Sequence, residues 1–336
     1  MILITGGAGF IGSHTAVALL EAGYEIAVLD NLSNSSEESL KRIKSITGKD
    51  FPFYYVDLLD YVATDRVFRE NKIDAVIHFA GLKAVGESVT MPLEYYHNNI
   101  TGTLNLCMIM KRRGVKKLVF SSSATVYGFA EKVPVTEDMP TSTTNPYGST
   151  KLMIENILKD LFVSDGDWSI ALLRYFNPIG AHKSGMLGEN PNGIPNNLMP
   201  RICSVVLGKM DKMTIWGTDY ETHDGTGVRD YIHVLDLAQG HIAALKKCDS
   251  DKGVFTYNLG TGTGYSVLDL LDTFSRVNNV EIPRVSMPRR PGDVESLYAD
   301  CTKAKEELGW EAKLGLEDMC RDSYNFIIKN PKGYNN

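Results

Sequence analysis

A tyrosine and a lysine lie four residues apart in the segment "TTNPYGSTKLMIEN", which spans residues 143–156. Pro146 favours the first turn of a helix, and residues i and i+4 of a helix lie on one face, about one turn apart. Tyr147 and Lys151 would then present a phenol and an ammonium group to one place, where they could take a proton from a hydroxyl group. The same spacing is typical of ordinary amphipathic surface helices, so its meaning depends on the rest of the chain.

Three serines end the apolar run "KLVFSSS" at residues 117–123, which has the composition of a buried strand. In a doubly wound sheet, the carboxyl ends of the strands face the crevice where ligands bind. Ser121, Ser122 and Ser123 are therefore expected beside a ligand, although serines after strands are often only turn or cap residues. With Tyr147 and Lys151 they indicate a Ser–Tyr–Lys constellation, in which Ser123 would hold the reacting oxygen by a hydrogen bond.

Short apolar runs alternate with segments of helical period in the first half of the chain. Strands buried on both faces read as continuous apolar runs, and right-handed crossovers through helices make them parallel. The sequence therefore predicts an α/β fold with a Rossmann-type, doubly wound parallel sheet. The predicted strands are "MILIT", "EIAVLD", "FPFYYVDL", "AVIHFAG", "KLVFSSS" and "SIALLRYFN", and the predicted helices span residues 11–22, 63–71, 92–113 and 146–163.

The chain changes character after Phe176, where residues 177–200 are rich in Gly, Pro and Asn. This stretch is longer than common connections, and long loops in compact enzymes often line sites. We predict a nucleotide-binding domain at residues 1–176 and a smaller mixed α/β substrate-binding domain at 177–336, with the helix in 234–250 packing back on the first. The second domain is predicted to contain helices at 197–208, 234–248, 266–277 and 316–329 and short strands near "MTIWG" and "FTYNLG".

A glycine-rich segment, "TGGAGFIG", follows the first predicted strand and opens the first predicted helix. Gly7, Gly9 and Gly12 match GxGxxG, and Gly6, Gly9 and Gly12 match GxxGxxG. Glycines there permit a tight turn and let the backbone approach a pyrophosphate, whose charge the helix N-terminus stabilises. In this setting the segment predicts a dinucleotide site, whereas a second cluster, "LGTGTGYS" at residues 259–266, is predicted to be mainly a loop.

Asp30 ends the second predicted strand, within the distance of about 20 residues expected for a carboxylate that binds the adenosine ribose. A simple turn or capping role is the alternative. A carboxylate would repel a 2'-phosphate, and Asn31 and Leu32 supply no arginine to bind one. The sequence therefore predicts NAD rather than NADP.

Tyr147 needs help to act as a base, because a tyrosine has an ordinary pKa near 10 and only about one in a thousand is ionised at pH 7. Lowering that pKa to near 7 requires about 4 kcal/mol. Lys151 and an oxidised nicotinamide both carry positive charge, so both are expected to stabilise the phenolate in a dry cleft. Lys151 is also expected to bind the nicotinamide ribose.

Composition argues against several classes of function. The 336 residues carry a net charge of -6 without a long run of like charges, which offers no footprint for nucleic acid or an anionic membrane. No segment approaches the roughly 20 apolar residues of a membrane span, and we expect no signal peptide. The five cysteines are scattered and lack a CxxC pair, which argues against a disulfide framework and a metal site. We expect a cytoplasmic protein that acts on small molecules.

The chain resembles, over nearly its whole length, the UDP-glucose 4-epimerases, which are extended short-chain dehydrogenases/reductases. The resemblance is carried by "TGGAGFIGSH", "HFAGLKAVGES", "FSSSATVYG", "PYGSTKLMIE", "LLRYFNPIGAH" and "DGTGVRDYIHV". The glycine motif and YxxxK are shared with the whole superfamily, whereas "HFAGLKAVGES" and "DGTGVRDYIHV" are far more specific. It implies reversible epimerisation of UDP-glucose and UDP-galactose in galactose metabolism, with tightly bound NAD, and a homodimer formed by pairing long helices of the first domain.

The resemblance also assigns residues to the two ligands. Besides the glycine motif, the NAD contacts it implies are Phe10, Ile11, Asp30, Asn31, Leu32, Ser33, Asn34, Ser35, Asp57, Leu58, Phe79, Ala80, Gly81, Leu82, Lys83, Asn98, Ser123, Tyr147, Lys151 and Phe176. The implied substrate contacts are Lys83, Ser123, Tyr147, Asn177, Asn197, Leu198, Trp216, Arg229, Arg290, Asp293 and Leu297. Arginines suit a diphosphate because guanidinium groups bind phosphate bidentately.

The resemblance implies a reaction in two halves. Tyr147 would remove the proton from the sugar 4-hydroxyl while the hydride on carbon 4 passes to NAD. The 4-keto sugar, anchored through UDP, would turn its other face to the reduced cofactor and receive the hydride back, so that net redox is zero. Such a site must bind the nucleotide firmly and the hexose loosely.

Three other functions are the alternatives to this one. Related nucleotide-sugar 4,6-dehydratases use an acidic pair where this chain has Ala124 and Thr125, so the elimination of water lacks its catalyst. A non-catalytic NAD-binding regulator would be expected to have lost Tyr147 or Lys151. An ordinary NAD-dependent UDP-sugar dehydrogenase would release NADH in proportion to the sugar oxidised.

Leu297 leaves the range of substrates open. Four residues after Asp293, broad-range members of the family carry a small residue and narrow ones carry a tyrosine, whose bulk would crowd an N-acetyl group. Leucine is intermediate in size. We expect weak activity on UDP-N-acetylglucosamine and UDP-N-acetylgalactosamine.

Overall fold

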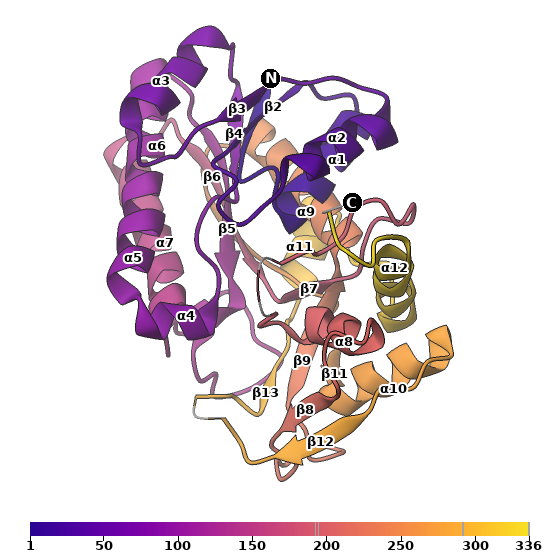
Figure 1. Ribbon diagram of the computed structural model, residues 1–336. Helices are drawn as coiled ribbons and strands as arrows, with labels where there is room; N and C mark the ends of the chain where they lie inside the picture. The colour runs from indigo at the N-terminus through magenta and orange to yellow at the C-terminus, as the bar shows by residue number, and fades with distance from the viewer. Residues whose placement is uncertain (192, 194, 291, 335–336) are drawn as a thin grey trace.

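A seven-stranded parallel sheet organises the larger domain (Figure 1). The computed structural model describes residues 1–191, 193, 195–290 and 292–334, and the remaining residues all fall in the predicted second domain. The strand order is β3-β2-β1-β4-β5-β6-β10, and every neighbouring pair is parallel. The strands are β1 (Ile2–Thr5), β2 (Ile26–Asp30), β3 (Phe53–Tyr55), β4 (Ala75–His78), β5 (Lys117–Ser123), β6 (Ser169–Tyr175) and β10 (Gly253–Leu259).

Helices cover both faces of this sheet (Figure 1), which confirms the predicted α/β fold. One face carries α1 (Phe10–Glu21), α2 (Glu37–Thr47), α9 (Val234–Ser250) and α11 (Thr302–Leu308). The other carries α3 (Tyr61–Glu70), α6 (Gly102–Arg113) and α7 (Pro146–Ser164), with α4 (Val85–Thr90) and α5 (Pro92–Tyr96) against α7. Alternate strand residues face opposite sides, so Ile4 joins the core under α1 and α9 whereas Leu3 joins the core under α6 and α7.

Strand β10 corrects the sequence analysis, which assigned "FTYNLG" to the smaller domain. All seven of its residues pair with β6, and it forms an edge of the main sheet. The reason is the preceding helix, because α9 packs against α1, β5 and β6 and so returns the chain to the sheet. The connection from β6 back to β10 therefore passes through strands and loops of the smaller domain.

Several helical segments also differ from the prediction, and the short helices α4 and α11 were not predicted. Residues 92–113, predicted as one helix, contain α5, a π-helical turn η1 (His97–Thr101) and α6. Helix α2 was not predicted, because its sequence is mostly polar and its apolar contacts come from Leu40 and Ile43. Ser36 caps it by accepting a hydrogen bond from the backbone N–H of Glu38.

The smaller domain lies beside the carboxyl ends of the main strands (Figure 1). Strand β9 (Val228–His233) pairs with β7 (Asn177–Ile179), β11 (Gly264–Ser266) and β13 (Ser296–Leu297), and β8 (Met213–Trp216) pairs with β12 (Arg284–Met287). Helices α8 (Leu198–Val206), α10 (Val267–Asn278) and α12 (Leu316–Lys329) enclose a separate apolar core with them. In the described residues, no helix combines the length and apolar composition that crossing a membrane requires.

Candidate active site

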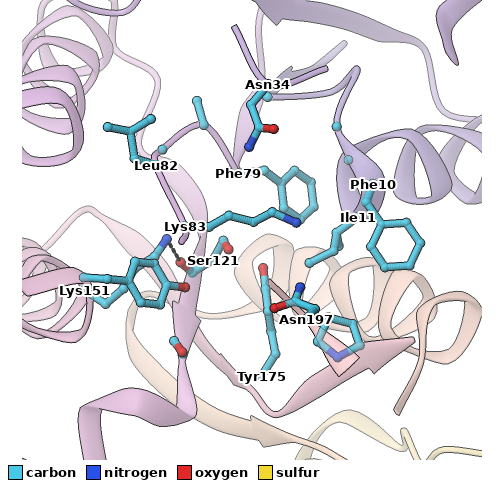
Figure 2. A pocket seen from close by; sticks show the side chains of 18 of the residues that line it. Phe10, Ile11, Asn34, Phe79, Leu82, Lys83, Ser121, Lys151, Tyr175 and Asn197 are labelled. Carbon is cyan, nitrogen blue, oxygen red and sulfur yellow. Dashed lines mark hydrogen bonds between the residues drawn. The ribbon is translucent and has the colours of Figure 1, made fainter. Parts of the chain in front are cut away.

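A cleft of about 500 Å³ opens between the carboxyl ends of the main strands and the smaller domain (Figure 2). Its lining comes from the ends of β1, β2, β4, β5 and β6 and, across from them, from residues 188–191 and 197–199, Arg229 and Leu297. The order of the strands reverses at β1, because β2 and β3 follow it on one side of the sheet whereas β4, β5 and β6 follow it on the other. Ligands of doubly wound sheets bind at this reversal of strand order.

The glycine motif forms a tight turn between β1 and α1. Gly6 has a φ of +69°, and a Cβ added there would lie 2.7 Å from the backbone N of Ala80. A Cβ on Gly12 would lie 2.3 Å from the carbonyl oxygen of Gly6 and 2.8 Å from the Cα of Gly7. Gly9 is the N-cap of α1 and offers no side chain to the first amides of the helix. The turn therefore fits the pyrophosphate of a dinucleotide, which needs close backbone approach and helical N–H groups.

Asp30 ends β2 at the cleft. Its carboxylate accepts hydrogen bonds from the backbone N–H groups of Ala8 at 3.0 Å and Leu32 at 2.9 Å, and from the Ser35 hydroxyl at 2.9 Å. A carboxylate has about four acceptor positions. One position is left for another donor, which fits the ribose hydroxyl of a bound NAD.

The π-helical turn η1 brings two asparagines to the cleft. Asn99 accepts a hydrogen bond from the backbone N–H of Leu82 at 2.7 Å and donates to the Leu82 carbonyl at 3.0 Å and the Thr150 hydroxyl at 3.1 Å. It thereby fastens the loop after β4 to α7. Asn98 also lines the cleft, as predicted, whereas Asn99 was not singled out from the sequence. Single π-helical turns are frequent at functional sites.

Ser123, Tyr147 and Lys151 meet where β5 ends. Asn145 caps α7 by accepting a hydrogen bond from Gly148 N–H at 2.9 Å, and Pro146 follows at the first helical position, which confirms the predicted helix start. Lys151 donates to the Ser121 carbonyl at 2.6 Å, and its Nζ lies 5.9 Å from the centre of the Tyr147 ring. Figure 2 shows the bond from Lys151 to Ser121, with Tyr175 and Asn197 beside the same cavity.

Burial changes the proton affinity of both functional groups. It raises the pKa of Tyr147, while the hydrogen bond with Ser123 acts in the opposite direction. It also lowers the pKa of Lys151 to about 8. Lys151 therefore does not offset the burial of Tyr147 by itself, and ionisation of the tyrosine requires further positive charge in the cleft. An oxidised nicotinamide would supply such a charge.

An ion pair bridges the two sides of the cleft. Lys83, from the loop after β4, lies 3.3 Å from the Glu189 carboxylate, which also accepts a hydrogen bond from Asn197 at 3.1 Å. The Glu189 side chain is only 9% exposed. Lys83 and Asn197 were predicted ligand contacts, whereas Glu189 was not. The sequence feature that could have indicated Glu189 is that it is the single carboxylate in the Gly-, Pro- and Asn-rich segment at residues 177–200.

The second glycine cluster surrounds a buried carboxylate. Asp230 accepts hydrogen bonds from the backbone N–H groups of Thr261 at 2.8 Å, Gly262 at 3.0 Å and Ala299 at 3.2 Å. A Cβ on Gly260 would lie 2.4 Å from the same carboxylate. These glycines thus allow the loop to approach the strand that carries Arg229.

Most predicted site residues line this one cleft. Those that do are Gly6, Gly9, Phe10, Ile11, Gly12, Asp30, Asn31, Ser33, Asn34, Ser35, Asp57, Leu58, Phe79, Ala80, Gly81, Leu82, Lys83, Asn98, Ser123, Tyr147, Lys151, Phe176, Asn177, Asn197, Leu198, Arg229, Asp293 and Leu297.

Four predicted residues lie outside the cleft lining. Gly7 faces β2, where an added Cβ would lie 2.8 Å from Val28. Leu32 packs against the apolar core under α1. The Arg290 guanidinium lies 2.9 Å from the carboxylate of Asp293 and 6.0 Å from the centre of the Trp216 ring. Arg290 and Trp216 therefore lie beside the lining residue Asp293, at the rim of the cavity and outside its lining.

Comparisons with known proteins agree with this geometry. Residues 2–260 match the model of the NAD dependent epimerase/dehydratase family. A UDP-glucose 4-epimerase of Bacillus subtilis is 63% identical over 333 residues, which are 99% of this chain and 98% of that protein.

Solved structures agree as well. A UDP-glucose 4-epimerase of Bifidobacterium longum, in complex with NAD+ and UDP, has a TM-score of 0.95 and 54% identity over 99% of each chain. The Stenotrophomonas maltophila enzyme, with NAD and formylated UDP-arabinopyranose, has a TM-score of 0.97 and 46% identity over 98% of each chain. The chain therefore belongs to the NAD dependent epimerase/dehydratase family, in its UDP-glucose 4-epimerase branch.

Proposed function

We propose that this protein interconverts UDP-glucose and UDP-galactose at sugar carbon 4, using bound NAD. The observation that carries the proposal is the meeting of Ser123, Tyr147 and Lys151 in the same cleft as the glycine turn and Asp30. Incubation with UDP-galactose should yield UDP-glucose without accumulation of NADH. One NADH formed per sugar would indicate a dehydrogenase instead, and no turnover of either sugar would contradict the proposal.

The side chains of the cleft divide the work. Tyr147 takes the proton of the sugar 4-hydroxyl at its phenolic oxygen and later returns it. Ser123 donates a hydrogen bond to the reacting oxygen, and Lys151 stabilises the phenolate and binds the nicotinamide ribose. Bound NAD supplies the hydride acceptor and a positive charge. Residues that only bind the substrate cannot replace Tyr147, because the proton of the 4-hydroxyl must leave as sugar carbon 4 is oxidised.

The two ligands are assigned to opposite sides of the cleft. NAD is held by residues 1–176, with α9 as their support, and the UDP-sugar by residues 177–336. Arg229, with Asn197 and Leu198, is proposed to hold the UDP end, and Arg290 with Asp293 to reach it from the rim. The dehydratase alternative gains no support, since Ala124 and Thr125 provide no acid at the end of β5 and the relatives described above are named epimerases.

NAD should bind about 100-fold more tightly than NADP. A 2'-phosphate would stand beside the Asp30 carboxylate, and a like-charge contact costs several kcal/mol. Titration of the cofactor-free protein with each nucleotide measures the ratio. Asp30→Ser should narrow it, whereas Asp60→Ser, which changes the cap of α3 outside the cleft, should not. Equal affinities of the unaltered protein for both nucleotides would refute this role of Asp30.

Leu297 should set the tolerance for an N-acetyl group on sugar carbon 2. It lines the cleft and packs against the cluster that contains Phe176. We expect Leu297→Ala to raise, and Leu297→Tyr to lower, the ratio of kcat/KM for UDP-N-acetylglucosamine to that for UDP-glucose, each by about tenfold. Assays of both sugars with the three proteins give this ratio. Ratios that do not follow side-chain size would remove Leu297 from the proposed site.

We propose that two copies pair through α5, α6 and α7. Large apolar side chains remain exposed along these helices, including Leu93 at 77%, Met108 at 51% and Met153 at 45%. Exposed apolar side chains that gather on one face mark interaction sites. Sedimentation should therefore give a dimer, and Met108→Asp should give monomers, whereas Ile328→Asp on α12 should not. A monomeric parent protein would contradict the pairing.

We place the protein in the cytoplasm. All five cysteines are free thiols, and four of them are buried. Unpaired thiols are typical of a reducing compartment. Immunolocalisation of the full chain tests this placement, and its recovery outside the cytoplasm would contradict it.

A further inference from the structure

Ser122 lies between Ser121 and Ser123 in β5, and its side chain faces the side of the sheet opposite to theirs. Side chains alternate along a strand, and Phe120 and Leu172 point toward the core under α7. In the register of β5 and β6, Ser122 lies directly opposite Arg174. The Ser122 and Arg174 side chains therefore lie on the face of the sheet that α7 covers. They lie at the carboxyl ends of β5 and β6, beyond the apolar core.

Glu155 of α7 contacts both of these side chains. It lies one helical turn after Lys151 and two after Tyr147, so all three share one face of the helix. Its side chain has no exposed surface. One carboxylate oxygen accepts from the Ser122 hydroxyl at 2.6 Å and from Arg174 Nε at 3.0 Å, and the other accepts from a second Arg174 nitrogen at 2.8 Å.

A buried ion pair is a poor device for stability alone, because well-packed apolar residues of similar size often stabilise as well or better. Such residues adjoin the pair, since Ile154 and Leu158 of α7 belong to the apolar core. Stability alone therefore does not explain why Glu155 and Arg174 are buried here, and their location in the fold suggests a role. The pair lies directly beneath the end of β5 that carries Ser123.

Two bonds from α7 hold that end of β5. Lys151 donates to the Ser121 carbonyl at 2.6 Å, and Glu155 accepts from the Ser122 hydroxyl at 2.6 Å. The next residue is Ser123, whose hydroxyl oxygen accepts from Thr125 N–H at 3.2 Å and from the Thr125 hydroxyl at 3.0 Å. A hydroxyl has two acceptor positions and one proton to give. Both acceptor positions are filled, so Ser123 is left as a donor facing Tyr147.

We propose that Ser122 and Glu155 are positioning residues, which fix the end of β5 on α7 so that the Ser123 hydroxyl is held beside Tyr147 and the reacting oxygen. The proposal rests on the function proposed above for Ser123 and Tyr147. Arg174 aligns the Glu155 carboxylate by donating to both of its oxygens, and its third nitrogen donates to the Tyr127 hydroxyl oxygen at 3.0 Å. Ser122 borders the cleft, as predicted, but its hydroxyl donates to Glu155, so it acts on the reaction through Ser123.

The test replaces Ser122 in the full-length, NAD-loaded enzyme. Ser122→Ala removes one tether but leaves Glu155 paired with Arg174, so the protein should fold. We expect kcat to fall about 10- to 100-fold with little change in KM, because small misplacements of a reacting group have effects of this size. The acid limb of kcat/KM should move to higher pH, because the hydrogen bond from Ser123 favours the ionised Tyr147. The other titratable groups around Tyr147 are Lys151, Tyr95 and Tyr175.

Two further variants separate positioning from plain stability. Ser169→Ala removes the hydroxyl of another buried strand serine, at the opposite end of the sheet, where it donates to the Asp251 carbonyl, and should leave kcat and the pH profile unchanged. Ser122→Thr keeps the hydroxyl and should restore most of the rate. If Ser122→Ala matches Ser169→Ala in rate and pH profile while Tyr147→Phe is inactive, the positioning role is wrong. If Tyr147→Phe keeps full activity, the proposed function itself is wrong.

Discussion

Tyr147→Phe should lower kcat by about two to four orders of magnitude while the protein keeps its NAD. The change removes a single oxygen from a buried ring and leaves its packing intact. General-base catalysis contributes about 10²- to 10⁴-fold in rate, and no other phenol or carboxylate has been assigned to the reacting oxygen. Steady-state conversion of UDP-galactose, with NAD content measured on the same sample, gives both quantities.

A matched variant shows whether the loss is specific to the cleft. Tyr24→Phe removes a phenolic oxygen from the turn after α1, which does not belong to the cleft lining. It should keep the parental rate and NAD content. If Tyr147→Phe also retained its rate, the proton would be leaving by another route, and the assignment of the base would be wrong.

Gly12→Ala should lower the affinity for NAD by about 100-fold, equivalent to about 2.7 kcal/mol. The new Cβ would lie 2.3 Å from the Gly6 carbonyl oxygen and 2.8 Å from the Gly7 Cα. Both neighbours are backbone atoms, so the turn itself has to open, and the N-terminus of α1 moves away from the pyrophosphate. Overpacking of this kind should also cost about 1–3 kcal/mol of stability. Nucleotide titration and thermal unfolding measure the two effects.

The control for this variant is Gly166→Ala. An added Cβ at Gly166 meets no atom within 4 Å. It should leave NAD affinity and unfolding temperature near those of the parent protein. A Gly12→Ala protein that bound NAD as tightly as the control would show that close approach at this turn is not required.

Local patterns in the sequence sufficed for six strands of the larger domain and for the centre of the cleft. The continuous apolar runs predicted six strands of the main sheet because parallel strands are buried on both faces. Tyr147 and Lys151 could be paired because one helical turn brings residues four apart together. Asp30 could be assigned to the cofactor because the second strand of this fold ends beside the glycine turn.

Contacts between distant segments could not be predicted in this way. Strand β10 joins the main sheet only because α9 packs on α1, and nothing in "FTYNLG" itself distinguishes an edge of one sheet from another. The pairing of Lys83 with Glu189 joins residues 106 apart. Glu155 lies in an apolar helix face and Arg174 in a buried strand, so each would be scored as an isolated charge until their contact is known.

The central claim is that oxidation and reduction of carbon 4 occur within one bound state, with no net redox change. UDP-galactose carrying deuterium at sugar carbon 4 tests it most directly. We predict that the product UDP-glucose retains the label at carbon 4 and that no labelled NADH is released into solution. Loss of the label to water, or its appearance in free NADH, would contradict the account.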